Sequence, residues 1–422
     1  MKHMKTTALI LGLVISAASV TGQNFPLKYS DLIRKADSLY TVKDFKNSAN
    51  AFSDAFRIKG CNPTSNERYN AACSWALAAC PDSAFYQLNY LATLMNYTRS
   101  GHLNADPDLN SLTGDNRWNP LLEAVQANKK KTYPGLDLIP VNGFKVEAVT
   151  YGLQNNQKGK PVIVFENGRG TEFDYWLPII NEVSKENASF AYNRPRIGNS
   201  DDDFQIPTID HIAELLRQAL LSKGLNPPYL LVGHSWGAAC IRCFAAFYPD
   251  EVAGLIFVDP HDFVKKPAGG RSCYREIGLT KSQIDSLFIE YDKSADEYMA
   301  QGPKFVVEEM KAQREFAKTG FEICNRNPLP EVPVHFIMAG GYPITPNMTD
   351  GLYDGQKMFR INNDIKMELW IEQINPLKYG KFIYLSNSGH MIQNDDPEVI
   401  ISSIKLALKD YDKIQNEKTL SR

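Results

Sequence analysis

The sequence predicts an α/β protein with a predominantly parallel sheet, preceded by an all-α N-terminal domain. In residues 138–413, short apolar runs alternate with stretches of helical periodicity, which is typical of a parallel sheet covered by helices on both faces. Residues 24–133, in contrast, show helical periodicity throughout. A chain of 422 residues is also long enough for two domains.

The N-terminus, residues 1–22, has the composition of a secretory signal peptide. Lysines precede an apolar run at 8–15, and small residues follow at 16–19, the order found in peptides that are removed on export. The apolar run is shorter than the roughly 20 residues of a membrane-spanning helix. The first cysteine, Cys61, lies too far downstream to carry a lipid anchor. We therefore expect an exported protein, periplasmic or secreted.

The overall composition is that of an ordinary globular protein. The formal net charge is -2, so electrostatics give no reason to expect nucleic acid or an anionic membrane as a partner. No cysteine and histidine spacing resembles a zinc site, and no cofactor or metal is expected.

The seven cysteines are an odd number, so at least one thiol stays free or pairs between chains. An oxidising compartment permits disulfides, and Cys273 with Cys324 is a candidate pair. Cys240 and Cys243 follow the central motif described below, where small buried apolar residues are the simpler interpretation.

The N-terminal domain has the spacing of helix pairs. Apolar and small residues between Leu32 and Ala55 follow a tetratricopeptide-like pattern, and further helical stretches lie at 69–76 and 84–88. One copy alone fits the repeat well, and three are normally needed for a stable array. We expect a small helical domain that serves as a platform for a protein partner, as part of the substrate mouth or as a stabilising cover.

The second domain has six apolar runs of strand length with helical patterns between several of them. Helices are expected at 209–222 and 238–248. Strands are expected at 161–165, 188–192, 229–232, 253–258, 334–338 and 382–385.

Residues 261–329 interrupt this alternation. The stretch is charged and has helical patterns at 281–300 and 304–317. Insertions of this length are usually functional, so we expect a helical lid that sets the size of the substrate. Its aromatic residues either line an apolar acyl pocket or pack in a core. These residues are Phe288, Tyr291, Tyr298 and Phe305.

The strand expected at 229–232 runs directly into Gly233-His234-Ser235-Trp236-Gly237, and small residues follow. A serine at so sharp a strand-to-helix turn has a strained backbone, and glycines two residues to either side leave the room that the turn requires. The hydroxyl then stands exposed at the carboxyl end of the sheet. Ser235 is therefore the candidate nucleophile.

With three further motifs, residues 141–411 resemble the α/β-hydrolase fold family. Residues 165–170 resemble its oxyanion loop, with Asn167 where many members carry His. Residues 192–200 resemble its Asp-Arg-x-Gly-x-Gly-x-Ser loop, and Ser388-Gly389-His390 stands where the family has its base. The resemblance implies an α/β-hydrolase fold with a helical lid insertion and the chemistry of a serine hydrolase.

The resemblance makes His390 the general base. A serine hydroxyl is a poor nucleophile until a base takes its proton, and an imidazole titrates near neutral pH. Two other histidines fit this role less well. His234 lies inside the turn, where it packs beside Ser235, and His335 belongs to an expected core strand.

The tetrahedral intermediate of acyl transfer needs two N–H donors for its oxyanion. The backbone N–H of Trp236, directly after the nucleophile, is one of them. The N–H of Arg169, in the glycine-flanked loop, is expected to be the other, while its side chain either anchors substrate or is solvated. Glu166 and Asn167 depart from the family pattern. They either bind substrate or brace the loop, and we expect bracing.

The acid that orients His390 is missing from the usual place in the family. The segment after 334–338 reads Ala-Gly-Gly-Tyr-Pro-Ile-Thr-Pro, without a carboxylate. Some members carry the acid after the preceding strand, where this chain has Asp259, although an Asp before Pro is also an ordinary turn residue. We expect Asp259 to be the acid, and the alternatives are Asp262, Asp350 and Asp354.

These residues predict an exported serine hydrolase that transfers an acyl group from a small-molecule or peptide substrate to water. A carboxylic ester is the expected substrate. Ser-Trp at this turn also occurs in members that cleave N-terminal residues from peptides, so an aminopeptidase or amidase is the alternative. A serine nucleophile, in place of an aspartate, disfavours dehalogenase and epoxide hydrolase chemistry.

A different class of function is a catalytically disabled hydrolase-fold protein that binds a partner. The missing carboxylate after Met338 favours this class. The presence of both Ser235 and His390 counts against it, because a binding protein has no use for the pair.

Overall fold

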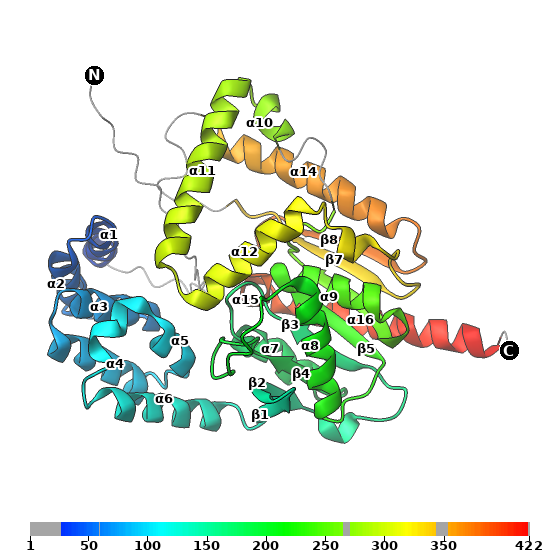
Figure 1. Ribbon diagram of the computed structural model, residues 1–422, viewed down its shortest axis with the longest axis horizontal. Helices are drawn as coiled ribbons and strands as arrows, with labels where there is room; N and C mark the ends of the chain where they lie inside the picture. Colours follow the sequence, from blue (N-terminus) through cyan, green and yellow to red (C-terminus); the bar gives the residue numbers. More distant parts are fainter. Residues whose placement is uncertain (1–26, 59, 265–270, 343–352, 421–422) are drawn as a thin grey trace. The chain divides into compact units, whose positions relative to one another are not determined.

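A computed structural model describes residues 27–58, 60–264, 271–342 and 353–420 (Figure 1). The described chain divides into two compact units between Leu136 and Asp137, and each unit is considered by itself. The expected signal peptide lies outside the described residues. Within them, no helix is both long enough and apolar enough to cross a membrane.

The N-terminal unit is entirely helical, as the periodicity predicts. Neighbouring helices pack in consecutive pairs, α1 on α2 and α3 on α4. A capping box begins α3, since Thr64 accepts the N–H of Glu67 and Glu67 accepts the N–H of Thr64. The likeness to tetratricopeptide repeats stays a prediction. The elements are α1 (Leu27–Thr41), α2 (Phe45–Phe56), α3 (Ser65–Leu77), α4 (Pro81–Leu94), α5 (Ser100–Ala105), η1 (Pro107–Leu112) and α6 (Trp118–Thr132).

The second unit is built on one eight-stranded sheet with the order β1-β2-β4-β3-β5-β6-β7-β8. The strands from β3 to β8 run parallel to their neighbours, whereas β2 runs antiparallel to β4. The strands are β1 (Leu136–Val141), β2 (Phe144–Tyr151), β3 (Val162–Glu166), β4 (Ser189–Tyr192), β5 (Tyr229–His234), β6 (Val252–Val258), β7 (Val334–Ala339) and β8 (Gly380–Leu385).

The predicted fold class is confirmed, and all six predicted strands are present in the parallel part of the sheet as β3 to β8. The sequence analysis missed the two strands at the N-terminal edge, β1 and β2. A two-residue Asn142-Gly143 turn joins them, with positive φ at both residues. This turn is a recognisable hairpin signal that the sequence analysis did not use.

Helices cover both faces of the sheet (Figure 1). On one face, α8 (Ile209–Ser222) and α9 (Trp236–Phe247) share a core with inward side chains of β3, β5 and β6. His335 shows what covers the other face. It lies between Val334 and Phe336, both in that core, so its side chain points the opposite way and bonds Ser403 of α16 (Pro397–Leu420) at 2.7 Å.

The insertion between β6 and β7 is helical where it is described, and α14 follows after β7. The helices are α10 (Ser272–Glu276), α11 (Lys281–Gln301), α12 (Lys304–Lys318), α13 (Glu322–Asn325) and α14 (Gly355–Ile374). The remaining short elements are η2 (Leu153–Asn155), η3 (Phe173–Trp176), α7 (Leu177–Val183), η4 (Pro249–Glu251) and α15 (Ile392–Asp395).

The candidate disulfide between Cys273 and Cys324 is not formed, and all seven cysteines are free thiols. Cys324 is fully buried and donates to the carbonyl of Ala239 at 3.6 Å, so it packs against α9. Cys240 and Cys243 are buried among apolar residues of the same helix, in agreement with their structural interpretation.

We predict that His335 makes this unit less stable in mild acid. Burial is the main reason why the pKa of its ring falls to about 4, and the charge of Lys381 adds to the shift. A histidine in the unfolded chain takes up its proton near pH 6.5. Between the two values the unfolded state binds more protons, so the free energy of unfolding falls by about 1.4 kcal/mol for each pH unit as the pH drops.

Urea denaturation of the wild type and of His335→Leu between pH 7 and pH 4 measures this effect. The difference in unfolding free energy should shift in favour of His335→Leu as the pH falls through the window. Met338→Leu, a buried apolar exchange on the same strand, should keep a constant difference from the wild type. Parallel curves for His335→Leu and the wild type would contradict the assignment.

Candidate active site

Ser235 occupies a strained turn between β5 and α9. Its backbone has φ 51° and ψ −116°, which few residues with a side chain adopt. A Cβ at Gly233 would lie 2.6 Å from the carbonyl oxygen of Gly237, and one at Gly237 would lie 2.4 Å from that of Glu166. Both glycines are therefore required sterically, as expected from the sequence. We call residues 233–237 the serine turn.

The register of the sheet brings Asp259 next to the serine turn. His234 pairs with Val258 across β5 and β6, so the residues that follow, Ser235 and Asp259, leave the sheet side by side. The N–H of Ser235 donates to the carbonyl of Val258 at 3.0 Å. Neighbouring parallel strands thus position two of the three candidate residues.

His390 bridges Ser235 and Asp259. Its Nε2 lies 3.1 Å from Ser235 Oγ, and its Nδ1 lies 2.5 Å from Asp259 Oδ2. The segment that carries it is held by backbone bonds, since Ser388 O accepts the N–H of Gly341 at 2.8 Å. The side chain of His390 is 56% exposed, so water and small substrates can reach it.

Asp259 is held in the orientation that His390 requires. Its Oδ1 accepts the N–H of Ala339 at 3.1 Å, which leaves Oδ2 for the imidazole. Burial by itself raises the pKa of Asp259, but the hydrogen bond and charge of His390, helped by the charge of Lys366, hold this pKa below its ordinary value. The carboxylate is therefore ionised near neutral pH and holds the Nδ1–H tautomer of His390.

The other acids proposed from the sequence do not take this place. Asp354 is the N-cap of α14, where its carboxylate accepts the N–H of Lys357 at 2.9 Å. Asp350 lies outside the described residues. Asp262 lies only three residues after Asp259, but the hydrogen bond of His390 Nδ1 is made with Asp259.

His234 is buried beside the catalytic candidates and supports them. Its Nε2 donates to the carbonyl of His390 at 2.8 Å, and the two rings lie 4.7 Å apart. Burial, together with the charge of His390, lowers the pKa of His234 to about 3, so its ring is neutral near pH 7. His234 therefore fixes the backbone of His390 and takes no proton itself.

The two expected oxyanion donors, the N–H groups of Trp236 and Arg169, belong to different elements. Trp236 is the first residue of α9, and the N–H of a first helical residue has no acceptor within its own helix. Arg169 belongs to the loop between β3 and η3, residues 167–172, which we call the β3 loop. Its side chain is exposed and donates to Gln313 of α12 at 2.7 Å.

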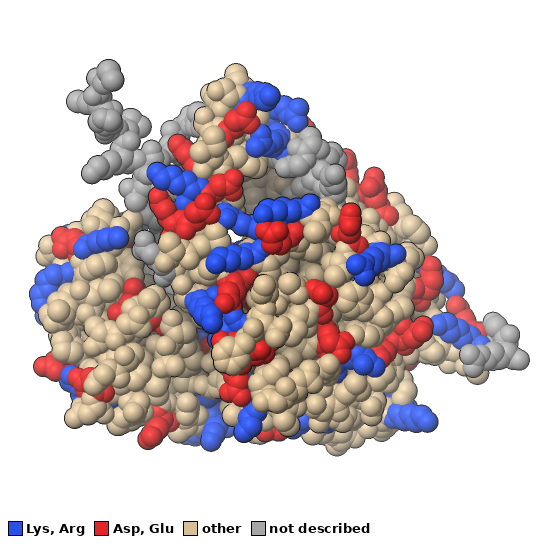
Figure 2. All heavy atoms as spheres, in the orientation of Figure 1, with Lys and Arg blue, Asp and Glu red and all other residues tan. Residues whose placement is uncertain are grey.

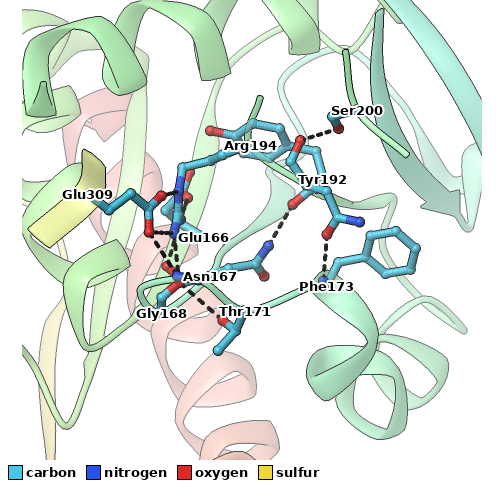
Figure 3. Close-up of polar contacts among 11 residues, drawn as sticks. Glu166, Asn167, Gly168, Thr171, Phe173, Tyr192, Arg194, Ser200 and Glu309 are labelled. Carbon is cyan, nitrogen blue, oxygen red and sulfur yellow. Dashed lines mark hydrogen bonds and ion pairs between the residues drawn. The ribbon is translucent and has the colours of Figure 1, made fainter. Parts of the chain in front are cut away.

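A buried cluster of charges, missed by the sequence analysis, lies behind the β3 loop (Figure 3). Arg194, only 1% exposed, donates at 2.6 Å to Glu166 at the end of β3 and at 2.6 Å to Glu309 of α12. It also donates to the carbonyls of Asn167 at 2.8 Å and Gly168 at 2.6 Å. Arg194 lies in the motif noted at 192–200, but the sequence gives no signal for Glu309.

The electrostatics of this cluster follow from its burial. Burial lowers the pKa of Arg194, but the nearby carboxylates of Glu309 and Glu166 outweigh it and raise this pKa well above its ordinary value. Burial also raises the pKa of Glu166 in spite of the opposing charge of Arg194. Glu166 and Asn167 brace the β3 loop, as expected, since Asn167 also donates to Tyr192 O at 2.7 Å.

The helix α12 of the insertion packs over the β3 loop and the serine turn. A Cβ at Gly170 would lie 2.9 Å from Val306 and 3.6 Å from Phe305. The ring of Trp236 stands edge-on to Phe316 at 5.7 Å.

The four aromatic residues proposed for an acyl pocket do not gather in one place. Phe288 packs on Tyr274 at 5.8 Å and under the guanidinium of Arg271 at 4.5 Å. Tyr291 is 69% exposed. Phe305 lies beside the β3 loop, and Tyr298 is near it too, since burial raises the pKa of Tyr298 while the charge of Arg169 opposes this rise.

Among the described residues, one group of three potential metal ligands lies close together, and it belongs to the N-terminal unit. Cys73, Asp106 and Asp108 place ligand atoms within 4.8 Å of one another. These groups already bond to protein neighbours, because Asp106 accepts the hydroxyl of Tyr69 at 2.6 Å and the thiol of Cys73 at 3.7 Å. The cluster has the bonding of a structural polar network.

Charges of both signs are interspersed over the face seen in Figure 2. Ion pairs of the second unit include Arg314 with Asp296 at 2.8 Å and Arg217 with Glu251 at 2.7 Å.

Comparison with known proteins gives a family for this unit. The family model described as alpha/beta hydrolase fold matches residues 161–284, which include β3 to β6, the serine turn and Asp259. Epoxide hydrolase 1 of Caenorhabditis elegans is 22% identical over 315 residues, 69% of this chain and 75% of that protein. An AB hydrolase superfamily protein of Gibberella zeae is 19% identical over 288 residues, 59% of this chain and 87% of that protein.

Shorter matches are found in Bacillus subtilis. The protein YqjL is 30% identical over 118 residues, 28% of this chain. The chain spans 47% of the length of YqjL and 41% of the length of a second relative, YbdG.

Among solved structures, Cfl2 from Burkholderia cenocepacia is 17% identical, with a TM-score of 0.39, and the match covers 64% of this chain and 94% of Cfl2. AqDC, described with its ring-cleavage product, is 10% identical with a TM-score of 0.46, covering 65% and 99% of the two chains. The sheet order, the serine turn and the family match agree. This unit has the alpha/beta hydrolase fold, and the family model of that description matches its residues 161–284.

Proposed function

We propose that this protein is an exported serine hydrolase that cleaves a carboxylic ester. The observation that carries the proposal is the continuous chain of hydrogen bonds from Ser235 Oγ through both nitrogens of His390 to Asp259. A disabled hydrolase that serves as a binding protein has no need for this alignment. Export is part of the proposal because of the sequence of residues 1–22 alone.

In the first half of the reaction, Ser235 Oγ attacks the ester carbonyl while His390 Nε2 takes the hydroxyl proton. The charge on the imidazolium is stabilised by the ionised Asp259, whose lowered pKa suits this role. The oxyanion of the tetrahedral intermediate accepts the N–H groups of Trp236 and Arg169. Its collapse breaks the ester C–O bond, and the proton on His390 passes to the departing alkoxide.

In the second half, water enters the exposed side of His390 and attacks the acyl-serine. His390 takes a proton from this water and returns one to Ser235 Oγ as the carboxylic acid leaves. The sum is an ester and water converted to an acid and an alcohol. A hydroxyl nucleophile forms this acyl-enzyme directly, which favours acyl transfer over the epoxide chemistry named for one relative.

We predict that a fluorophosphonate probe labels the mature protein at one residue, Ser235. The probe reports a serine whose hydroxyl is activated by an adjacent base, so Ser235→Ala should remove all labelling and ester hydrolysis. Ser388→Ala, at a neighbouring buried serine, controls for labelling at other sites. Equal labelling of Ser235→Ala and the wild type would exclude the serine hydrolase proposal. Labelling is read by intact-protein mass spectrometry.

We predict that Asp259→Asn lowers kcat by about 10³ to 10⁴-fold, because an amide stabilises the wrong tautomer of His390. Asp262→Asn and Asp354→Asn provide matched controls and should change kcat less than threefold. Steady-state rates on a 4-nitrophenyl ester measure all three variants. If Asp262→Asn or Asp354→Asn lost activity while Asp259→Asn retained it, the acid would have to be reassigned.

We predict that the protein hydrolyses 4-nitrophenyl acyl esters with a higher kcat/KM than aminoacyl 4-nitroanilides of matched size. Esters have a better leaving group, and no described side chain of the site is committed to a substrate amine. A series of acyl chains from acetyl to decanoyl, run beside the anilides, separates the two classes. A preference for free N-terminal aminoacyl anilides would favour the aminopeptidase alternative.

A further inference from the structure

We infer that Glu309 and Arg194 are positioning residues for the oxyanion hole, so that helix α12 of the insertion assembles this part of the active site. The inference rests on the proposed function, since it concerns how the site holds the oxyanion. It adds a role for the insertion that neither the sequence motifs nor the family match assigns. Figure 3 shows the contacts on which it depends.

Arg194 fixes the direction of the peptide group that carries the Arg169 N–H. The carbonyl of Gly168 accepts Nη2 of Arg194 at 2.6 Å. This carbonyl and the N–H of Arg169 belong to one peptide unit, and in a trans peptide the two groups point in opposite directions. Binding of the carbonyl by the buried guanidinium therefore turns the Arg169 N–H away from Arg194.

Glu309 fixes the next peptide group along the chain. The N–H of Gly170 donates to Glu309 Oε2 at 2.8 Å, and the same oxygen accepts Arg194 Nη2 at 3.2 Å. The other oxygen accepts Arg194 Nε at 2.6 Å. Both peptide groups that flank Arg169 are thus bound, one through its carbonyl by Arg194 and one through its N–H by Glu309.

The β3 loop lies against both sides of Ser235. A Cβ at Gly237 would stand 2.5 Å from the carbonyl oxygen of Asn167, and a Cβ at Gly168 would stand 2.8 Å from Nδ1 of His234. The loop is therefore in contact with the residue before Ser235 and with the helix turn after it. An N–H of this loop that points away from Arg194 faces the side on which the serine turn lies.

The insertion is therefore required for the orientation of the loop. Glu309 comes from α12, whereas Arg194 and the β3 loop follow strands of the sheet. Displacement of α12 would leave the Gly170 N–H without its acceptor and remove one of the two carboxylates around a guanidinium that is 1% exposed. A buried charge without partners is strongly unfavourable, so the cluster favours the arrangement in which α12 covers the loop.

The decisive variant is Glu309→Gln, which keeps the volume of the side chain. A carboxamide has one acceptor oxygen, so it cannot accept Arg194 Nε and the Gly170 N–H through separate oxygens as the carboxylate does. Glu315→Gln is the matched control, because Glu315 is on the same helix but 70% exposed and paired with Lys318. Both are assayed as full-length protein, with active sites counted by the end point of fluorophosphonate labelling.

We predict that Glu309→Gln lowers kcat per active site by about tenfold to a hundredfold with KM nearly unchanged, since an oxyanion donor acts mainly in the transition state. Affinity for a trifluoromethyl ketone with the preferred acyl chain, which forms a tetrahedral adduct with serine, should fall by the same factor. Glu315→Gln should match the wild type in both measurements. A role in folding alone would lower the number of active sites and leave both values per site unchanged.

The inference is overturned if Glu309→Gln binds the ketone and turns over ester within threefold of the wild type. If Glu309→Gln does not fold, Glu309→Asp supplies the test, because it keeps the charge but withdraws the carboxylate by one methylene; wild-type values for this variant would equally overturn the inference. Failure of the proposed function is a separate result, read from Ser235→Ala. If Ser235 is required for activity but Glu309 is not, the serine hydrolase proposal stands and the role of α12 is rejected.

Discussion

The arrangement of the site depends on one constraint, the parallel direction of strands β3 to β8. Parallel strands end at the same edge of a sheet, and each candidate residue follows such an end. Ser235 follows β5, Asp259 follows β6 and His390 follows β8 by five residues. At the same edge, Glu166 is the last residue of β3 and Arg194 follows β4 by two residues. The strand register then sets the distance between Ser235 and Asp259, because the pairing of His234 with Val258 places these two residues side by side.

A second level of organisation lies behind this edge, where Arg194 joins three segments that are far apart in the sequence. Its guanidinium has enough donors for the carboxylates of Glu166 and Glu309 and for two carbonyls of the β3 loop. An arginine buried to 1% exposure needs such partners, and they in turn hold a loop that has little regular structure of its own. Polar groups that are satisfied only together specify one arrangement of the loop.

The sequence predicted best those elements whose pattern of apolar residues follows directly from their place in the fold. Strands β3 to β7 are mostly apolar runs because parallel strands between two helical layers are buried on both faces. The sequence analysis did not find β1 and β2, at the antiparallel side of the sheet. The helix α14 was not predicted, because it is mostly part-exposed and therefore weakly patterned. The pair Cys273 and Cys324 could not be judged from spacing, because a disulfide depends on distance in space.

The sequence by itself determined the two-unit organisation, the parallel sheet and the serine turn, because each follows from periodicity or from the steric demand of glycine. It also reduced the candidates for the acid that orients His390 to four aspartates. Only the tertiary structure shows which of the three described aspartates bonds His390, since the position of His390 relative to each depends on strand register. The bond from Glu309 to the β3 loop was likewise beyond the sequence. It joins residues 139 apart, and no local pattern records a contact formed only when an insertion folds over the sheet.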